Sequence, residues 1–224
     1  MIAAASLVLA LLAPRAEERY ALAYRAKLGE VRKTSVTAVY KVGGPPIEYR
    51  YELSLEVLKV DRDGSTTVRT EIGTKVWKEE GQPEIRNEGV ESWEARYNAR
   101  GEELPDEETD EPEEDDPVSS LLRLAAGYEP ETPVALGETW TPPMDERLNL
   151  YPLTYYLTGA SPKELMLEGK GPGRDGANLD VKVWLDARTF APRRSVIRIT
   201  AAPTETGNDG EVLVTMESKV LLGR

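Results

Sequence analysis

A strict two-residue alternation of apolar and polar side chains in residues 47–57, IEYRYELSLEV, constrains the fold more than any other feature of the sequence. Successive side chains of a β-strand point to opposite faces, whereas a helix would mix the two sets. The segment is therefore predicted to be a strand with one buried face. That face would carry Ile47, Tyr49, Tyr51, Leu53, Leu55 and Val57.

The same period predicts two hairpins. Residues 65–77 follow the first strand after the turn DRDG, and their Val68, Ile72 and Val76 alternate with charged residues. Such a short connection joins antiparallel strands, because a parallel crossover needs a dozen or more residues. In the second hairpin, the apolar residues of 179–185 are expected to pair with Ile197 and Ile199.

Further strands are expected at 20–26, 31–41, 154–160, 163–169 and 210–222, with an additional pair at 84–90 and 92–102. One helix is predicted at Pro117–Ala126, because Asp116 can cap it, proline suits its first position and Gly127 can end it. The predicted fold is mainly β, an antiparallel half-barrel or open sandwich of about nine to eleven strands with one covering helix.

The N-terminal residues favour export. Residues 2–13 form an unbroken run of twelve apolar or small residues, which suits the core of a signal peptide and is too short to span a bilayer. Residues 1–16 are therefore predicted to be a signal peptide or N-terminal hydrophobic segment, with a buried first helix as the alternative. Residues 17–224 would then form a single β domain of a periplasmic or extracellular protein that is not integral to the membrane.

Most of the negative charge lies in one stretch. The formal net charge is −12, and residues 102–116 contain eleven acidic residues and no basic ones, so the rest of the chain carries about −1. This stretch cannot bury a core and is predicted to be a solvated acidic loop. A weak Ca²⁺ site and contact with a basic partner are the alternatives. The overall charge argues against nucleic acid or an anionic membrane surface as the main partner.

The chain has no Cys and no His, which excludes disulfides, thiol nucleophiles, Ser/His/Asp triads and Cys/His zinc sites. The motifs GxSxG, GxxxxGK[ST] and SxxK are absent as well. Residues 169–176, GKGPGRDG, are predicted to be a hairpin loop rather than a phosphate cradle, and Asp186 is predicted to hold the backbone of the turn that it begins. No enzymatic activity, cofactor or metal site is expected.

Aromatic residues are the remaining candidates for a binding function. The chain has ten Tyr and four Trp but a single Phe, and several tyrosines fall on predicted apolar faces. Ordinary core packing is one interpretation, and a curved sheet that leaves a cavity for an apolar ligand is the other. The residues predicted to bind such a ligand are Tyr49, Tyr51, Leu53, Leu55, Leu121, Leu122, Leu124 and Tyr155.

Two stretches of sequence resemble a known group of proteins. PVALGETW at 133–140 and VWLDARTFAPRRSVI at 183–197, together with the order of the predicted elements, resemble bacterial envelope proteins of the lipoprotein-carrier (LolA/LolB-like) half-barrel type and uncharacterised exported β-proteins that share this phrasing. The resemblance implies an incomplete barrel with helix over an apolar concave face, where the carriers hold acyl chains. The acidic loop and the single predicted helix depart from the carrier pattern.

The expected function is non-enzymatic binding of an apolar or lipid-like ligand in the cell envelope. The alternative is a structural or protein-interaction module that uses the acidic loop or a sheet edge as its contact.

Overall fold

The computed structural model describes residues 18–41, 44–98, 103–104, 129–142, 153–173, 176–200 and 210–221. The regular elements in these ranges are fifteen strands. In chain order they are β1 (Arg19–Tyr20), β2 (Val31–Lys41), β3 (Ile47–Val60), β4 (Thr66–Ile72), β5 (Lys75–Glu79), β6 (Ile85–Asn87), β7 (Glu91–Tyr97), β8 (Glu103–Leu104), β9 (Val134–Ala135), β10 (Thr139–Trp140), β11 (Thr154–Ala160), β12 (Glu164–Pro172), β13 (Asn178–Asp186), β14 (Pro192–Thr200) and β15 (Glu211–Leu221). Five have three residues or fewer, and the ten longer strands agree with the predicted number. The predicted signal peptide at 1–16, the predicted helix at 117–126 and nearly all of the acidic loop lie outside the described residues.

Thirteen strands form one continuous sheet. Its main path runs β10-β11-β12-β13-β14-β15-β2-β3-β4-β7-β8, and β5 and β6 branch from β3. Every pairing in it is antiparallel. Among the described strands, β10 and β8 end the path without pairing to each other, so the sheet is open. This confirms the predicted fold class, a mainly β, antiparallel open half-barrel or sandwich.

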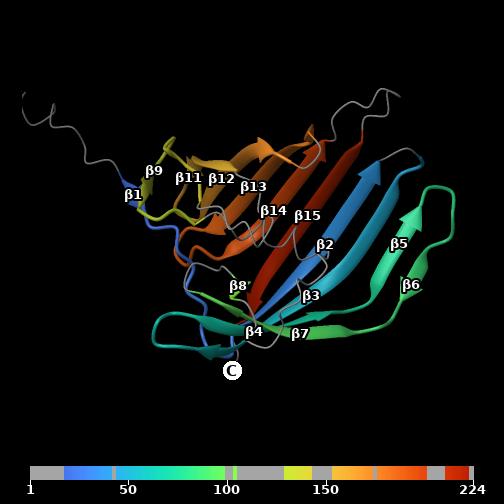
Figure 1. Ribbon diagram of the computed structural model, residues 1–224, viewed down its shortest axis with the longest axis horizontal. Coiled ribbons are helices and arrows are strands. Elements are labelled where there is room, and N and C mark those ends of the chain that lie inside the picture. The colour runs from blue at the N-terminus through green and yellow to red at the C-terminus, as the bar shows by residue number, and fades with distance from the viewer. Residues whose placement is uncertain are drawn as a thin grey trace, which may run out of the picture.

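The sheet is bent into a trough (Figure 1). Strands β11 to β14 form one wall, β15, β2 and β3 lie along the middle, and β4 and β7 turn across the other side. The β5–β6 hairpin projects beyond β3. Because β15 pairs with β2 along the whole of both strands, the C-terminal strand is joined to an N-terminal one in the middle of the trough.

The N-terminal segment packs against the sheet instead of adding a strand to it. The strand predicted at 20–26 is wrong beyond Tyr20, because β1 ends there and pairs with the short β9. Leu22 is fully buried in the core and anchors this segment by packing. The Gly29 N–H then donates to the Val57 carbonyl at 2.9 Å, and the turn before β2 needs glycine because its φ is +73°.

The hairpin predicted for 47–57 and 65–77 forms with one interruption. The β3–β4 register passes into the β3–β5 register with one extra residue on the second strand, which places a β-bulge at residues 73–74. A shift by one residue moves the following side chains to opposite faces. Val76 was expected on the apolar face, but it lies on the polar face, and Trp77 lies on the apolar one.

The pair predicted for 84–90 and 92–102 does not form. β6 pairs with β5, and β7 pairs with β4 along its full length. The bulge explains this difference, because it bends residues 66–79 in the middle and gives each half its own partner. The β5–β6 hairpin is therefore a branch of the sheet (Figure 1).

The β13–β14 hairpin forms as predicted, with Leu179 opposite Ile199 and Val181 opposite Ile197. Asp186 holds its turn, because its Oδ1 accepts hydrogen bonds from the backbone N–H groups of Arg188 and Thr189, both at 2.9 Å. The hairpin loop predicted for GKGPGRDG at 169–176 is wrong for its first half, because Gly169 to Pro172 belong to β12 and pair with β13. Residues 174–175 lie outside the described residues.

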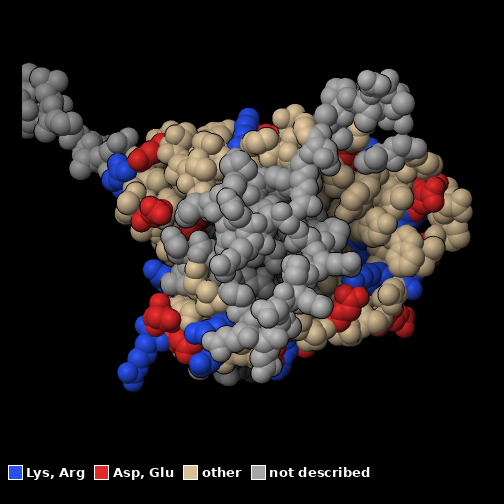
Figure 2. All heavy atoms as spheres, viewed as in Figure 1, with Lys and Arg blue, Asp and Glu red and all other residues tan. Residues whose placement is uncertain are grey.

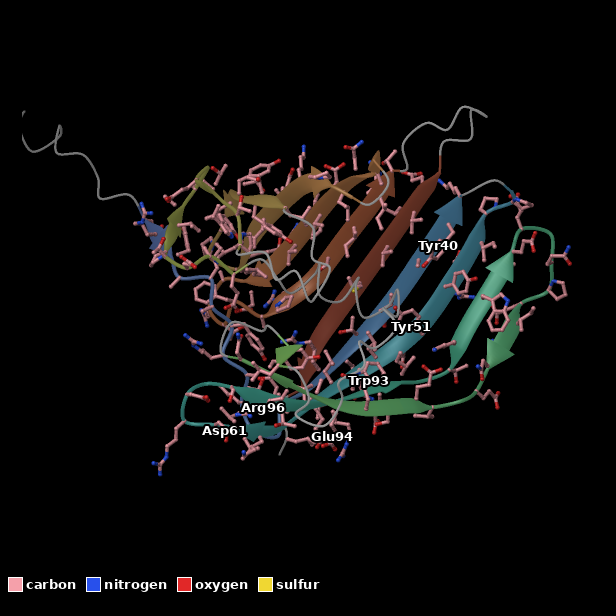
Figure 3. The ribbon with its side chains drawn as sticks, in the orientation of Figure 1. Tyr40, Tyr51, Asp61, Trp93, Glu94 and Arg96 are labelled. Atoms are coloured by element: carbon pink, nitrogen blue, oxygen red, sulfur yellow. The ribbon has the colours of Figure 1, made fainter. Side chains whose placement is uncertain are left out.

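The two faces of the sheet differ in chemistry. The concave face, here the inner face, is mainly apolar and supplies the core, whereas the outer face carries ion pairs between neighbouring strands. Arg69 on β4, for example, lies 2.8 Å from Glu94 on β7. Figure 3 shows Tyr51 and Trp93 directed into the trough and Glu94 on the other side of β7. Because exposed ion pairs contribute less than about 1 kcal/mol each, burial of the inner face dominates stability.

Candidate functional site

One row of inner-face residues crosses ten strands. Direct cross-strand pairing aligns them from β10 to β6 in the order Trp140, Tyr155, Gly169, Val181, Ile197, Val214, Ala38, Tyr49, Trp77 and Ile85. Every member except the glycine has an apolar or aromatic side chain. We call this alignment the cross-sheet row.

Burial changes abruptly along the cross-sheet row. The hydrophobic side chains from Tyr155 to Ala38 are at most 3% exposed, whereas Tyr49 is 38% and Ile85 is 49% exposed. Trp77, between these two, is half-buried. The inner face thus has a closed section on β11 to β15 and β2. It also has an open section, which we define as Ile47, Tyr49, Tyr51 and Leu55 on β3 and the inner face of β5 and β6, together with Tyr40 at the end of β2.

The closed section is a packed core. A Cβ placed on Gly169 would lie 2.6 Å from Cε1 of Tyr155, so a glycine is needed for this ring to lie flat on the sheet. The Trp140 ring stacks on Tyr155 with centroids 6.1 Å apart and planes at 21°. Burial raises the pKa of Tyr155 and keeps its hydroxyl neutral. These contacts leave the ring no room to meet a ligand without repacking.

The open section is aromatic rather than aliphatic. The Tyr40 and Tyr49 rings meet edge to face, with centroids 5.2 Å apart and planes at 78°. Trp77 lies directly opposite Tyr49 on the neighbouring strand. Figure 3 shows Tyr40, Tyr51 and Trp93 spaced along the trough from β2 to β7. In Figure 2 the surface over β3 and β5 consists mainly of uncharged atoms, with acidic and basic side chains around it.

The predicted ligand-binding residues in the described part of the chain all lie on the inner face. They are Tyr49, Tyr51, Leu53, Leu55 and Tyr155. Leu53 and Tyr155 are fully buried, Tyr51 and Leu55 are half-buried, and Tyr49 is exposed. Leu121, Leu122 and Leu124 lie outside the described residues. That these side chains contact a ligand stays a prediction.

Trp77 and Ile85 belong to the open section and were missed from the sequence. Both depend on the bulge at residues 73–74, which reverses the faces of everything that follows it. The glycine within an alternating run was the available signal, since an isolated Gly in a strand often marks a bulge. Tyr40 continues the alternation of Val36 and Ala38 and could have been assigned to this face.

A partly buried carboxyl fixes the N-terminal segment. Glu129 Oε1 accepts a hydrogen bond from the backbone N–H of Tyr24 at 3.0 Å. Burial raises the pKa of Glu129 to about 8, and the charge of Arg25 opposes this rise. The side chain of Tyr24 makes a separate contact, because the Arg32 guanidinium lies over its ring at 4.6 Å from the centroid. The partners of this carboxyl thus include main chain of the N-terminal segment, which gives it a structural role.

The acidic side chains of the β3–β4 turn are engaged locally. Ser65 donates its hydroxyl to Asp63 at 2.7 Å, and Asp61 forms ion pairs with Lys59 at 2.8 Å and with Arg96 at 3.4 Å (Figure 3). Within the described ranges, no three or more acidic side chains are grouped so that they could hold a metal ion. The described residues also contain no helix with the length and apolar character needed to cross a bilayer.

No protein-family model and no curated protein sequence matches the chain. Solved structures do match its fold. A structure described as showing lipid–protein interactions in lipovitellin matches with a TM-score of 0.52 at 8% identity, over 88% of this chain and 26% of that one. The chain therefore spans about a quarter of the length of lipovitellin. At this identity the likeness is one of fold alone.

Two bacterial structures match with lower scores. The complex of MucA and MucB from Pseudomonas aeruginosa has a TM-score of 0.26 at 15% identity, over 84% of this chain and 52% of that one. A DUF1329 family protein from Desulfovibrio piger has a TM-score of 0.24 at 10% identity, over 86% and 85% of the two chains. Scores this low support no argument about common structure, so the resemblance to lipoprotein carriers stays a prediction.

Proposed function

We propose that this chain is a non-enzymatic protein of the cell envelope that binds an apolar or lipid-like ligand on the inner face of its sheet. The proposal rests on the cross-sheet row, which is apolar across ten strands. Its side chains are buried in the closed section and exposed or half-buried in the open section. Apolar surface left exposed in a concave sheet favours a hydrocarbon ligand, because burial contributes about 25 cal/mol per Å². The assignment to the envelope rests on the apolar run at residues 2–13.

The open section would supply the contacts. On β3 a ligand would reach Tyr49, Tyr51 and Leu55, and on the branch it would reach Trp77 and Ile85. These side chains are rigid or branched and lose little rotamer entropy when a ligand covers them. The fold similarity to lipovitellin, a protein described for its lipid–protein interactions, supports a lipid-like ligand.

A protein-interaction module is the second candidate. Ile85 and Val90 are exposed on and beside β6, and among the described strands β6 pairs with β5 alone. A free strand edge with apolar neighbours can accept a strand from another protein. In that case the open section would be covered by protein instead of lipid.

A fluorescent fatty acid titrated into the purified mature chain tests the proposal, together with native mass spectrometry for lipid that co-purifies. Trp77→Gln is expected to weaken binding about ten-fold, because it removes a large apolar contact. Trp184→Gln is the matched control, since this indole lies on the outer face with Arg194 over its ring at 4.9 Å. Absence of both lipid and fatty-acid binding, or equal losses in the two variants, would overturn the proposal and favour the interaction module.

A further inference from the structure

Five side chains of the open section lie together in two adjacent rows. In the first row, Ile47 on β3 lies between Tyr40 on β2 and Glu79 on β5. In the second row, Tyr49 on β3 lies opposite Trp77 on β5. Ile47 and Tyr49 therefore form a floor on β3. Tyr40 stands on one side of it, and Trp77 and Glu79 stand on the other. The two sides are two strand spacings apart, about 9.5 Å, and the Tyr49 ring lies between them in edge-to-face contact with Tyr40.

The composition of this cluster matches what a cation requires. The faces of Tyr and Trp rings are regions of negative potential that attract a cation within about 6 Å of the ring centroid. Glu79 adds a formal negative charge beside the three rings, and its side chain is half-buried. With the other described residues, the Glu79 carboxylate makes no hydrogen bond or ion pair.

The basic residues nearest in sequence do not occupy the cluster. Lys75 shares the inner face with Trp77, but its Nζ lies 2.7 Å from both carboxylate oxygens of Glu91. Arg50 and Lys78 alternate with inner-face residues and lie on the outer face, where Arg50 pairs with Glu84 at 2.6 Å. Arg32 and Arg194 lie over the rings of Tyr24 and Trp184, which are outside the cluster. None of these basic residues pairs with Glu79, so a ligand can supply a cation to its carboxylate.

We propose that Tyr40, Tyr49, Trp77 and Glu79 bind a quaternary ammonium group, the head of a choline-bearing amphiphile. Such a group has no N–H to donate, so it needs no hydrogen-bond acceptors, and its charge is covered by methyl groups that pack against aromatic rings. A primary ammonium is a compact and strongly hydrated charge, which a half-buried aromatic site desolvates at greater cost. This inference rests on the proposed function, which concerns the apolar tail of the ligand, and adds a site for its head. The cluster is also expected to bind a quaternary ammonium compound that has no tail.

Choline chloride titrated into the mature chain at constant ionic strength tests this site, with binding followed by isothermal titration calorimetry and Trp fluorescence. The neutral carbon isostere 3,3-dimethylbutan-1-ol has the same shape without the charge. We expect saturable choline binding and at least about five-fold weaker binding of the isostere, since the attraction of cation to rings and carboxylate is lost. Absence of saturation, or equal affinity for the two probes, would overturn the proposal.

Two substitutions separate the site from general electrostatic attraction. Glu79→Gln and Tyr49→Leu are each expected to weaken choline binding about two- to five-fold. Glu80→Gln removes the same charge one residue later, in the exposed turn after β5, and is expected to leave the affinity unchanged. Equal losses in the Glu79 and Glu80 variants would overturn the assignment. Loss of fatty-acid binding with intact choline binding would contradict the proposed function and leave the ammonium site standing.

Discussion

Burial of the Glu129 carboxyl makes folding depend on pH across the neutral range. Its pKa is 4.5 in the unfolded reference and about 8 in the folded protein, so the folded chain retains a proton that the unfolded chain releases between these values. The unfavourable contribution of this group is therefore absent below pH 4.5, grows as the pH rises and is complete above pH about 8. The free energy of unfolding is expected to fall over that window.

The substitution Glu129→Gln is expected to remove this pH dependence. The amide oxygen of Gln can still accept the N–H of Tyr24, so the variant should match the native protein near pH 5 and exceed its stability near pH 9 by as much as a few kcal/mol. Urea unfolding followed at several pH values measures the difference. A difference that stays constant from pH 5 to 9 would show that this carboxyl ionises in the folded protein without cost.

Individual inner-face residues could be predicted where the alternation is unbroken. Tyr49, Tyr51, Leu53 and Leu55 share a face because their spacing is two, and the structure agrees. The contact of the Tyr155 ring with the glycine on the next strand could not be predicted, since it depends on the β11–β12 register. Sequence spacing determines the face of a side chain, but register determines its neighbour.

The β13–β14 turn is an element whose local chemistry is readable from the sequence. Asp186 accepts two backbone N–H groups and the Thr189 hydroxyl with one carboxylate oxygen, and its other oxygen pairs with Arg193. Phe190 adopts a φ of +57°, a conformation that is unfavourable for a bulky residue and needs support from its surroundings. Burial alone would raise the pKa of Asp186, but the N–H groups of Thr189 and Arg188 outweigh it, and the pKa is lowered.

Replacing Asp186 by Ala is expected to lower the free energy of unfolding by about 1–3 kcal/mol at neutral pH, because the turn loses all of these bonds. The loss should shrink under acidic conditions, as pH falls through the lowered pKa and the carboxylate takes up its proton. Asp180→Ala on the same strand is the control. Its carboxylate is exposed and 3.9 Å from Lys170, so a change below about 0.5 kcal/mol is expected. Similar losses in both variants would mean that the turn tolerates the missing contacts.

The β4–β5 connection shows where element-scale prediction ends. The alternation of residues 65–77 identified strand structure correctly, yet one inserted residue reversed the face of Val76 and Trp77. The same bend gave β6 and β7 different partners, so the predicted pairing between them failed. A bulge leaves the pattern of apolar residues in the sequence unchanged, and here the only indication of it is a glycine. Periodicity alone therefore could not show which residues form the open section.

At the scale of the whole molecule, one apolar face serves as core in one part and as candidate binding surface in another. The closed section is covered within the fold, and the open section continues the same cross-sheet row onto the β5–β6 branch (Figure 1). A mainly β fold with an apolar inner face could be predicted from the alternation of apolar and polar residues. The division of that face was not, because it follows from how far the sheet bends and which strands branch.

The division can be tested with one substitution made at two points of the cross-sheet row. Ile197 is fully buried and Ile85 is 49% exposed, so the same change to Ala removes the same atoms from the two sections. Ile197→Ala is expected to cost about 2–5 kcal/mol in urea unfolding, because it leaves a cavity in the core.

Ile85→Ala is expected to change stability by less than about 1 kcal/mol and to weaken fatty-acid binding several-fold, because its side chain would meet the ligand instead of the core. Comparable stability losses at both positions would identify the open section as ordinary core. The surface needed for a lipid-like ligand would then be absent from the β5–β6 branch, and the proposed function would fail there.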